Sequence, residues 1–180
     1  MKNMIKSVIV LSLICLVVAG ALGATNYITK DKIKADTEMR TQEALKELIS
    51  DAEAFEKLES IESLGLSKEI SAVYLADGGA KGYVFEISTK GYSSGLVIMC
   101  AVSPEGEIIK TSTLSHSETP TIGGAKVVDN ASYTDKFIGK DASSIDDGTD
   151  AVSGATVSSN AYKNAVKTAL DAFGKIASIG

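Results

Sequence analysis

The spacing of hydrophobic residues changes along the chain, and its first part predicts a membrane span. From Ile5 to Ala24 nearly every residue is apolar, and Lys6 is the only charged one. About 20 apolar residues are what a helix needs to cross the hydrocarbon layer of a membrane. We therefore expect a transmembrane anchor over residues 1–28. The small residues of AGALGA leave open a second interpretation, a cleaved signal peptide.

Helical spacing follows the apolar run. Between residues 29 and 60, apolar residues recur every three to four positions among charged ones: Leu45, Leu48, Ile49, Ala52 and Phe55. This pattern predicts an amphipathic linker helix, or more simply a stalk or core-packing helix. Lysines stand on both sides of the apolar run, so the count of positive charges leaves its orientation open.

From Ile70 to Leu114 the period becomes two. Four β-rich runs, SAVYLA, GYVFEIS, GLVIMCAVS and EIIKTSTL, are separated by DGG, KGYSSG and PEG. We expect a loop at SHSETPTIGG, mostly irregular chain up to residue 150, and a closing helix from Ser158 to Ala177. The predicted fold class is therefore α+β: an N-terminal transmembrane helix, then one antiparallel-sheet domain over residues 61–180 with flanking helices.

Composition excludes several classes of function. The net charge of -5 and the pI near 5.0, without a basic stripe, argue against a nucleic-acid partner. Cys15 and Cys100 lie in apolar runs, and His116 is the only histidine, so no ligand set for iron–sulfur, haem or zinc is evident. No G-x-S-x-G or G-x-G-x-x-G motif follows a strand. We expect no metal site and no catalytic residues of a freestanding enzyme.

The stretch DAVSGATVSS, residues 150–159, places four hydroxyl side chains and a glycine directly before the closing helix. One interpretation is structural, with Ser158 or Ser159 as the N-cap of the helix. The other concerns Thr156, where the positive end of the helix dipole and free backbone N–H groups favour an anion. The position is suited to a phosphate group.

Two motifs resemble those of the FMN-binding domain family. Asp150, Ser153, Gly154, Ala155 and Thr156 match the signature D-x-x-S/T-G-A-T, in which a flavin transferase joins FMN to the threonine through a phosphoester. The segment HSETPTIG, with His116, Glu118 and Thr119, is similar to the family's H-x-E-T-P-G-L-G and departs from it at Thr121 and Ile122. The order of anchor, sheet and motifs resembles the G subunit of the Rnf electron-transport complex, a relative of the C subunit of the sodium-pumping NADH:quinone reductase.

The resemblance implies an electron-transfer subunit, with FMN covalently attached to Thr156, of a membrane ion-translocating ferredoxin:NAD+ oxidoreductase rather than a freestanding enzyme. It also implies that the cofactor lies near Asp150, Ser153, Gly154, Ala155, His116, Glu118 and Thr119. The implied partners are the other membrane subunits of an Rnf-type complex and a flavin transferase. The implied location is the cell membrane, with a single span and the FMN domain outside the cytoplasm.

Three alternatives stay open. The chain could be a stand-alone membrane-anchored FMN electron carrier, or an anchored binding or assembly module without a cofactor. Within the flavoprotein interpretation, the competing acceptors for FMN are Ser153, Ser158 and Ser159.

Overall fold

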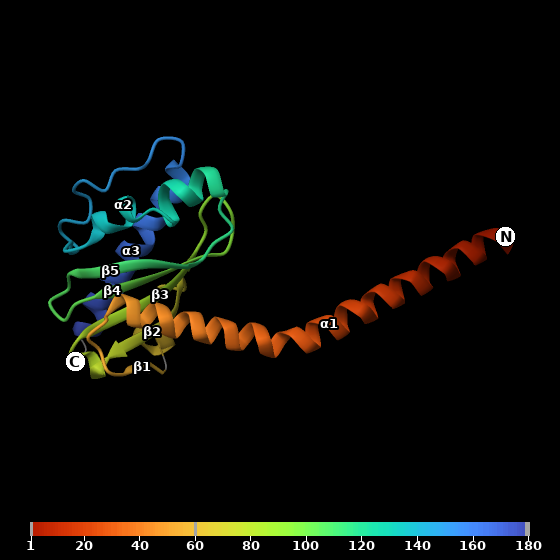
Figure 1. Ribbon diagram of the computed structural model, residues 1–180, viewed down its shortest axis with the longest axis horizontal. Coiled ribbons are helices and arrows are strands. Elements are labelled where there is room, and N and C mark those ends of the chain that lie inside the picture. Colours follow the sequence, from red (N-terminus) through yellow and green to blue (C-terminus); the bar gives the residue numbers. More distant parts are fainter. Residues whose placement is uncertain (1, 60, 179–180) are drawn as a thin grey trace. The chain divides into compact units, whose positions relative to one another are not determined.

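The chain divides into two compact units, Met1–Thr41 and Gln42–Gly180. The computed structural model describes residues 2–59 and 61–178. One helix, α1 (Lys2–Leu48), belongs to both units (Figure 1). Within the described residues, it is the one helix long and apolar enough to cross a membrane. From Ile5 onward its large apolar side chains in the first unit are exposed, Leu11 and Leu16 among them.

The helix ends at Leu48, so the linker helix predicted over residues 29–60 is too long. The Asp77 carboxylate accepts hydrogen bonds from the backbone N–H groups of Glu53 and Ala54, at 3.0 and 2.8 Å. These two residues are thereby held next to the hairpin that follows, where Phe55 pairs with Ala76. The chain consequently forms a short strand, β1 (Phe55–Lys57), where the spacing of apolar residues predicted helix.

The second unit is built on one antiparallel sheet with the order β1-β2-β3-β4-β5. Its further strands are β2 (Ile70–Ala76), β3 (Gly82–Thr89), β4 (Leu96–Val102) and β5 (Ile108–Ser115). Short 3-10 turns, η1 (Ile61–Leu64) and η2 (Asp77–Gly79), lie before and after β2. The four predicted strands are present, and the expected antiparallel α+β class is confirmed with β1 as a fifth strand.

Both faces of the sheet are buried. Side chains on a strand alternate between the two faces, and each face packs into its own hydrophobic cluster. On one face, Phe85, Ile98 and Val102 pack against α3 (Thr156–Ala177), which lies across the sheet in Figure 1. On the other face, Val84, Met99 and Ala101 pack against Leu45 and Leu48 at the end of α1 and against Ile49, the residue that follows it.

The segment after β5 is more ordered than the polar sequence indicated. A π-helix, η3 (Pro120–Val128), occupies part of the expected loop, and α2 (Ala131–Thr134) and η4 (Asp135–Phe137) follow it. The N–H groups of Gly124 and Asp129 each donate to a carbonyl five residues earlier, at 3.0 Å. The burial of Val127, Val128, Tyr133 and Phe137 explains why the segment is fixed.

Leu45 tests whether the end of α1 is part of the folded core. Leu45→Ala should lower the free energy of unfolding by about 2–4 kcal/mol, because the buried side chain leaves a cavity under the sheet. Lys46→Ala, at an exposed neighbouring position, should change it little. Urea unfolding of a chain that begins at Thr29 measures both, and equal effects would show that α1 is not packed there.

Candidate functional site

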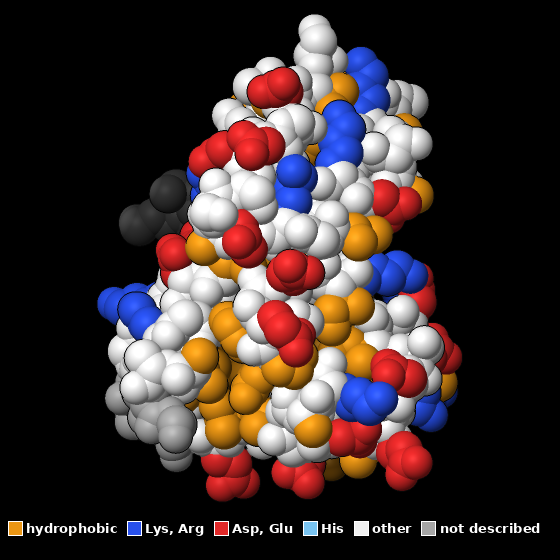
Figure 2. Space-filling view, turned by 90° about the vertical axis from the view of Figure 1, so that its left-hand side faces the viewer, with side chains coloured by type: hydrophobic (Ala, Val, Ile, Leu, Met, Phe, Trp, Pro, Cys, Tyr) orange, Lys and Arg blue, Asp and Glu red, His pale blue; other side chains and the backbone are white. Residues whose placement is uncertain are grey.

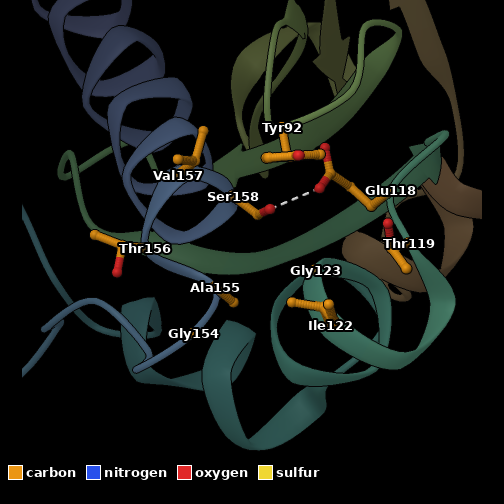
Figure 3. Close-up of a pocket in the computed structure, with 10 residues that line it drawn as sticks. All are labelled: Tyr92, Glu118, Thr119, Ile122, Gly123, Gly154, Ala155, Thr156, Val157 and Ser158. Carbon is orange, nitrogen blue, oxygen red and sulfur yellow. Dashed lines mark hydrogen bonds between the residues drawn. The ribbon is translucent and has the colours of Figure 1, made fainter.

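A cavity of about 410 Å³ lies where the β3–β4 turn, η3 and the start of α3 meet (Figure 3). Its size is within the range of small-molecule sites. The residues that line it come from three separate segments: Tyr92, Glu118, Thr119, Ile122, Gly123, Gly154, Ala155, Thr156, Val157 and Ser158. The cavity therefore depends on the packing of these segments against one another.

The Glu118 carboxylate joins the three segments. Its side chain is buried, with 5% of the residue exposed. Ser158 Oγ in α3 donates to Glu118 Oε2 at 2.6 Å, as Figure 3 shows, and the Ser93 N–H donates to Oε1 at 3.0 Å. A buried carboxylate is costly unless it is hydrogen-bonded. Both oxygens have a donor here, so Glu118 holds the wall of the cavity together.

Two glycines make room for this carboxylate. A Cβ at Gly91 would lie 2.3 Å from Glu118 Oε1, and a Cβ at Gly123 would lie 2.4 Å from Oε2. Both separations are far below van der Waals contact, so a side chain at either position would displace Glu118. Gly123 would also bring its Cβ to 2.6 Å from Ser158 Oγ. The glycines are required by packing rather than by backbone conformation.

His116 supports the loop and does not line the cavity. Its Nδ1 accepts a hydrogen bond from the Glu118 N–H at 3.2 Å, so in the neutral ring the proton is on Nε2. Nε2 lies 3.1 Å from Asp129 Oδ1 and donates to it. The imidazole thus connects the two ends of η3.

The turn before α3 is fixed by Ser159. Its Oγ accepts from the Val152 N–H at 3.0 Å and donates to the Ala155 carbonyl at 2.9 Å. Gly154 takes the left-handed conformation, with φ of 78°, which a glycine adopts without strain. This geometry corrects the N-cap interpretation of Ser158 and Ser159: α3 begins earlier, at Thr156, and both serines lie buried in its first turn.

Thr156 is the first residue of α3 and is exposed. No side chain caps the helix at Ala155, so the first-turn N–H groups keep their capacity for an anion. Figure 3 shows the Thr156 hydroxyl pointing away from the Glu118–Ser158 pair. Thr156 is therefore exposed, whereas the Glu118–Ser158 pair beside it is buried.

The candidate residues predicted from the sequence fall into three places. Gly154, Ala155, Thr156, Glu118 and Thr119 line the cavity. Ser153 lines a second cavity of about 450 Å³, together with Lys126, Asn130, Ser132, Tyr133, Lys136 and Val152. Asp150 is exposed and lines neither cavity. His116 also lines neither cavity and contacts the backbone of Glu118.

Three exposed apolar side chains at the cavity were not predicted as site residues. Tyr92, Ile122 and Val157 are 74%, 46% and 54% exposed. Solvent-exposed apolar groups around a cavity are typical of ligand sites. Tyr92 in the polar turn KGYSSG is the one sequence signal that could have indicated this rim. A flat aromatic cofactor fits such walls, and a phosphate fits the adjoining start of α3.

All residues that line the cavity lie within a segment that matches a known domain family. Residues 91–171 match the FMN-binding domain, so the class of protein is a flavin-binding one. Residues 1–48 match the RnfG N-terminal region.

Relatives match over almost the whole chain. The G subunit of the ion-translocating oxidoreductase complex of Shewanella baltica is 30% identical, over 94% of this chain and 90% of the relative. That of Shewanella piezotolerans is 29% identical, over 93% and 88%. The G subunit of the proton-translocating ferredoxin:NAD(+) oxidoreductase complex of Clostridium ljungdahlii is 28% identical, over 89% and 86%. The chain belongs to the family of G subunits of ion-translocating oxidoreductase complexes, and the resemblance stated from the motifs is confirmed.

Gly123 tests the packing of the cavity wall. Gly123→Ala should destabilise the domain by about 1–3 kcal/mol, because the new methyl group collides with Glu118 and Ser158. Gly174→Ala is the matched control: it lies inside α3 with open space around it, and should stabilise the domain by about 0.5–1 kcal/mol. Thermal unfolding compares the two, and a neutral Gly123→Ala would contradict the described wall.

Proposed function

We propose that this chain is an electron-transfer subunit of an ion-translocating, Rnf-type complex and that it carries FMN on the Thr156 hydroxyl. The observation that carries the proposal is the position of Thr156: an exposed hydroxyl at an uncapped helix start, beside a cavity with an apolar rim, inside the FMN-binding domain. The relatives named as complex subunits favour this function over a stand-alone carrier or a cofactor-free module.

The two ends of FMN fit two parts of the site. The first turn of α3 would hold the phosphate, since its N–H groups and dipole favour negative charge. The exposed apolar side chains of Tyr92, Ile122 and Val157 would contact the isoalloxazine ring. Glu118 and Ser158 would support that wall from behind, through their 2.6 Å hydrogen bond. FMN supplies the redox chemistry, and the protein supplies position and surroundings.

Attachment needs an activated phosphorus, so we propose a flavin transferase as the maturation partner and a phosphoanhydride of FMN as its substrate. Thr156 Oγ1 forms the new bond to phosphorus, and the phosphoanhydride P–O bond breaks. The leaving phosphate takes the electron pair, and the hydroxyl proton passes to a base of the transferase. The exposure of Thr156 allows the enzyme to reach it.

The burial of the competing acceptors supports the proposal of Thr156. Ser158 and Ser159 are buried and hydrogen-bonded within the domain, so neither hydroxyl is accessible to a transferase. Ser153 is exposed but lines the second cavity, not the one beside Thr156. Ser153 is therefore the useful control.

Residues 1–28 would form a single-pass anchor in the cell membrane, with the FMN domain outside the cytoplasm, where a covalent bond retains the cofactor. The supporting observation is the apolar first half of α1. On the face shown in Figure 2, basic and acidic side chains are both present, and acidic ones stand on either side of the basic ones.

Thr156→Val tests the attachment site. Valine keeps the shape of threonine but lacks the oxygen, so covalent flavin should be lost while the fold and melting temperature are retained. After coexpression with a flavin transferase, peptide mass spectrometry should find FMN on the peptide of the wild type and of Ser153→Ala. FMN on the Thr156→Val peptide would show that another residue is the acceptor.

The anchor is tested by washing membranes. The full chain should stay with the membrane fraction in high salt and leave it only in detergent, because the apolar residues of α1 lie in hydrocarbon. A chain that begins at Thr29 should be found in the soluble fraction. Release of the full chain by salt alone would exclude an integral anchor.

A further inference from the structure

Lys126 in η3 lies directly beside the turn that precedes Thr156. A Cβ placed on Gly154 would be 3.4 Å from Lys126 Nζ, which is ordinary van der Waals contact. Gly154 and Lys126 are 28 positions apart in the sequence, and the turn of η3 against the start of α3 brings them together. Lys126 also lines the second cavity, on the side of the turn where Ser153 lies.

The ammonium group of Lys126 has no anionic partner among the residues that the structure describes. The ion pairs found there are made by Lys81, Lys110, Lys163 and Lys167, by Arg40 and by His116. The pair of Lys163 and Lys167, for example, lowers the pKa of Asp146 to about 2 through their hydrogen bonds. Lys136, in the same cavity as Lys126, lies over the ring of Tyr133 at 5.7 Å from its centroid.

Thr156 is within reach of this charge. It stands two residues after Gly154, at most about 7 Å along the chain. Its hydroxyl points away from the Glu118–Ser158 pair, and Lys126 does not line the cavity that contains that pair. A phosphodiester on Thr156 Oγ1 would thus extend away from that pair, and a phosphate oxygen directed along the turn toward Gly154 would approach the Lys126 ammonium.

We infer that Lys126 is a positioning residue for the flavin phosphate: its ammonium is the counter-charge of the phosphodiester on Thr156. This inference rests on the proposed function, and it adds a residue outside both sequence motifs. A charge-assisted hydrogen bond from Lys126 would limit rotation about the Thr156 linkage and so direct the flavin ring toward Tyr92 and Ile122. It would also favour attachment by attracting the anionic flavin substrate.

The first experiment uses phosphorus NMR of the flavin-loaded full chain in detergent. The ³¹P resonance of Lys126→Gln should be displaced from that of the wild type, whereas Lys126→Arg, which keeps the charge, and Lys136→Gln should stay near it. Adding salt should move the wild-type resonance toward that of Lys126→Gln, because salt screens an exposed ion pair. Attachment to Lys126→Gln should be about two- to fivefold slower, the effect of one exposed ion pair. Coincident resonances of wild type and Lys126→Gln at every salt concentration would overturn the inference.

The second experiment needs no variant, so it decides the question even if Lys126→Gln does not fold. An amine-acetylating reagent should modify Lys126 several-fold more slowly in the loaded wild type than in the unloaded one, with the rate at Lys136 as the reference. Equal relative rates would overturn the inference. Peptide mass spectrometry of the same samples distinguishes failure of the proposed function from failure of the inference about Lys126. Absence of FMN from the wild-type Thr156 peptide would overturn the proposed function, and this inference with it.

Discussion

The buried carboxylate of Glu118 is the interaction on which the candidate site depends. It receives a hydrogen bond from Ser158 in α3 and another from the backbone of Ser93 in the β3–β4 turn, while its own backbone lies just before η3. Removing either donor would leave a charged oxygen without a partner away from water. The three segments are thus fixed relative to one another by one group.

This arrangement separates a buried part of the site from an exposed part. Glu118 and Ser158 are buried and hydrogen-bonded to each other. Neither the Glu118 carboxylate nor the Ser158 hydroxyl is therefore free to react with a flavin substrate. Thr156, two positions before Ser158, faces solvent at the uncapped start of α3. In our proposal the rigid wall positions the flavin ring, and the accessible threonine receives the phosphate. In the same proposal Lys126, near the end of η3, supplies the opposite charge.

The elements that depend on local patterning could be predicted from the sequence. The apolar run, the four strands between turn residues and the closing helix all follow from local sequence patterns. The end of α1 could not, because the Asp77 carboxylate that holds Glu53 and Ala54 comes from a later hairpin. The π-helix η3 is likewise stabilised by burial of Val127 and Val128, although its sequence has the proline and glycines of a loop.

Only those site residues that belong to a recognisable motif could be predicted from the sequence. The two motifs indicated Glu118 and Thr156, which the fold brings to one cavity. Tyr92 and Lys126 lie outside the motif residues used for the prediction, and their positions follow from the packing of the β3–β4 turn and η3 against α3. Ser158 looked like a helix cap because its partner, Glu118, is 40 residues away in the sequence.

The most direct test of the account is to map the effect of flavin attachment on the backbone amide resonances of residues 29–180. If the cavity holds the flavin ring, attachment should shift the resonances of Tyr92, Ile122 and Gly123 as well as those of Gly154 and Thr156. Residues 66–71, on another surface of the domain, should be unchanged. Shifts confined to the residues around Thr156 would contradict the account. They would mean that the flavin ring is in solvent and does not bind in the cavity whose wall contains Glu118.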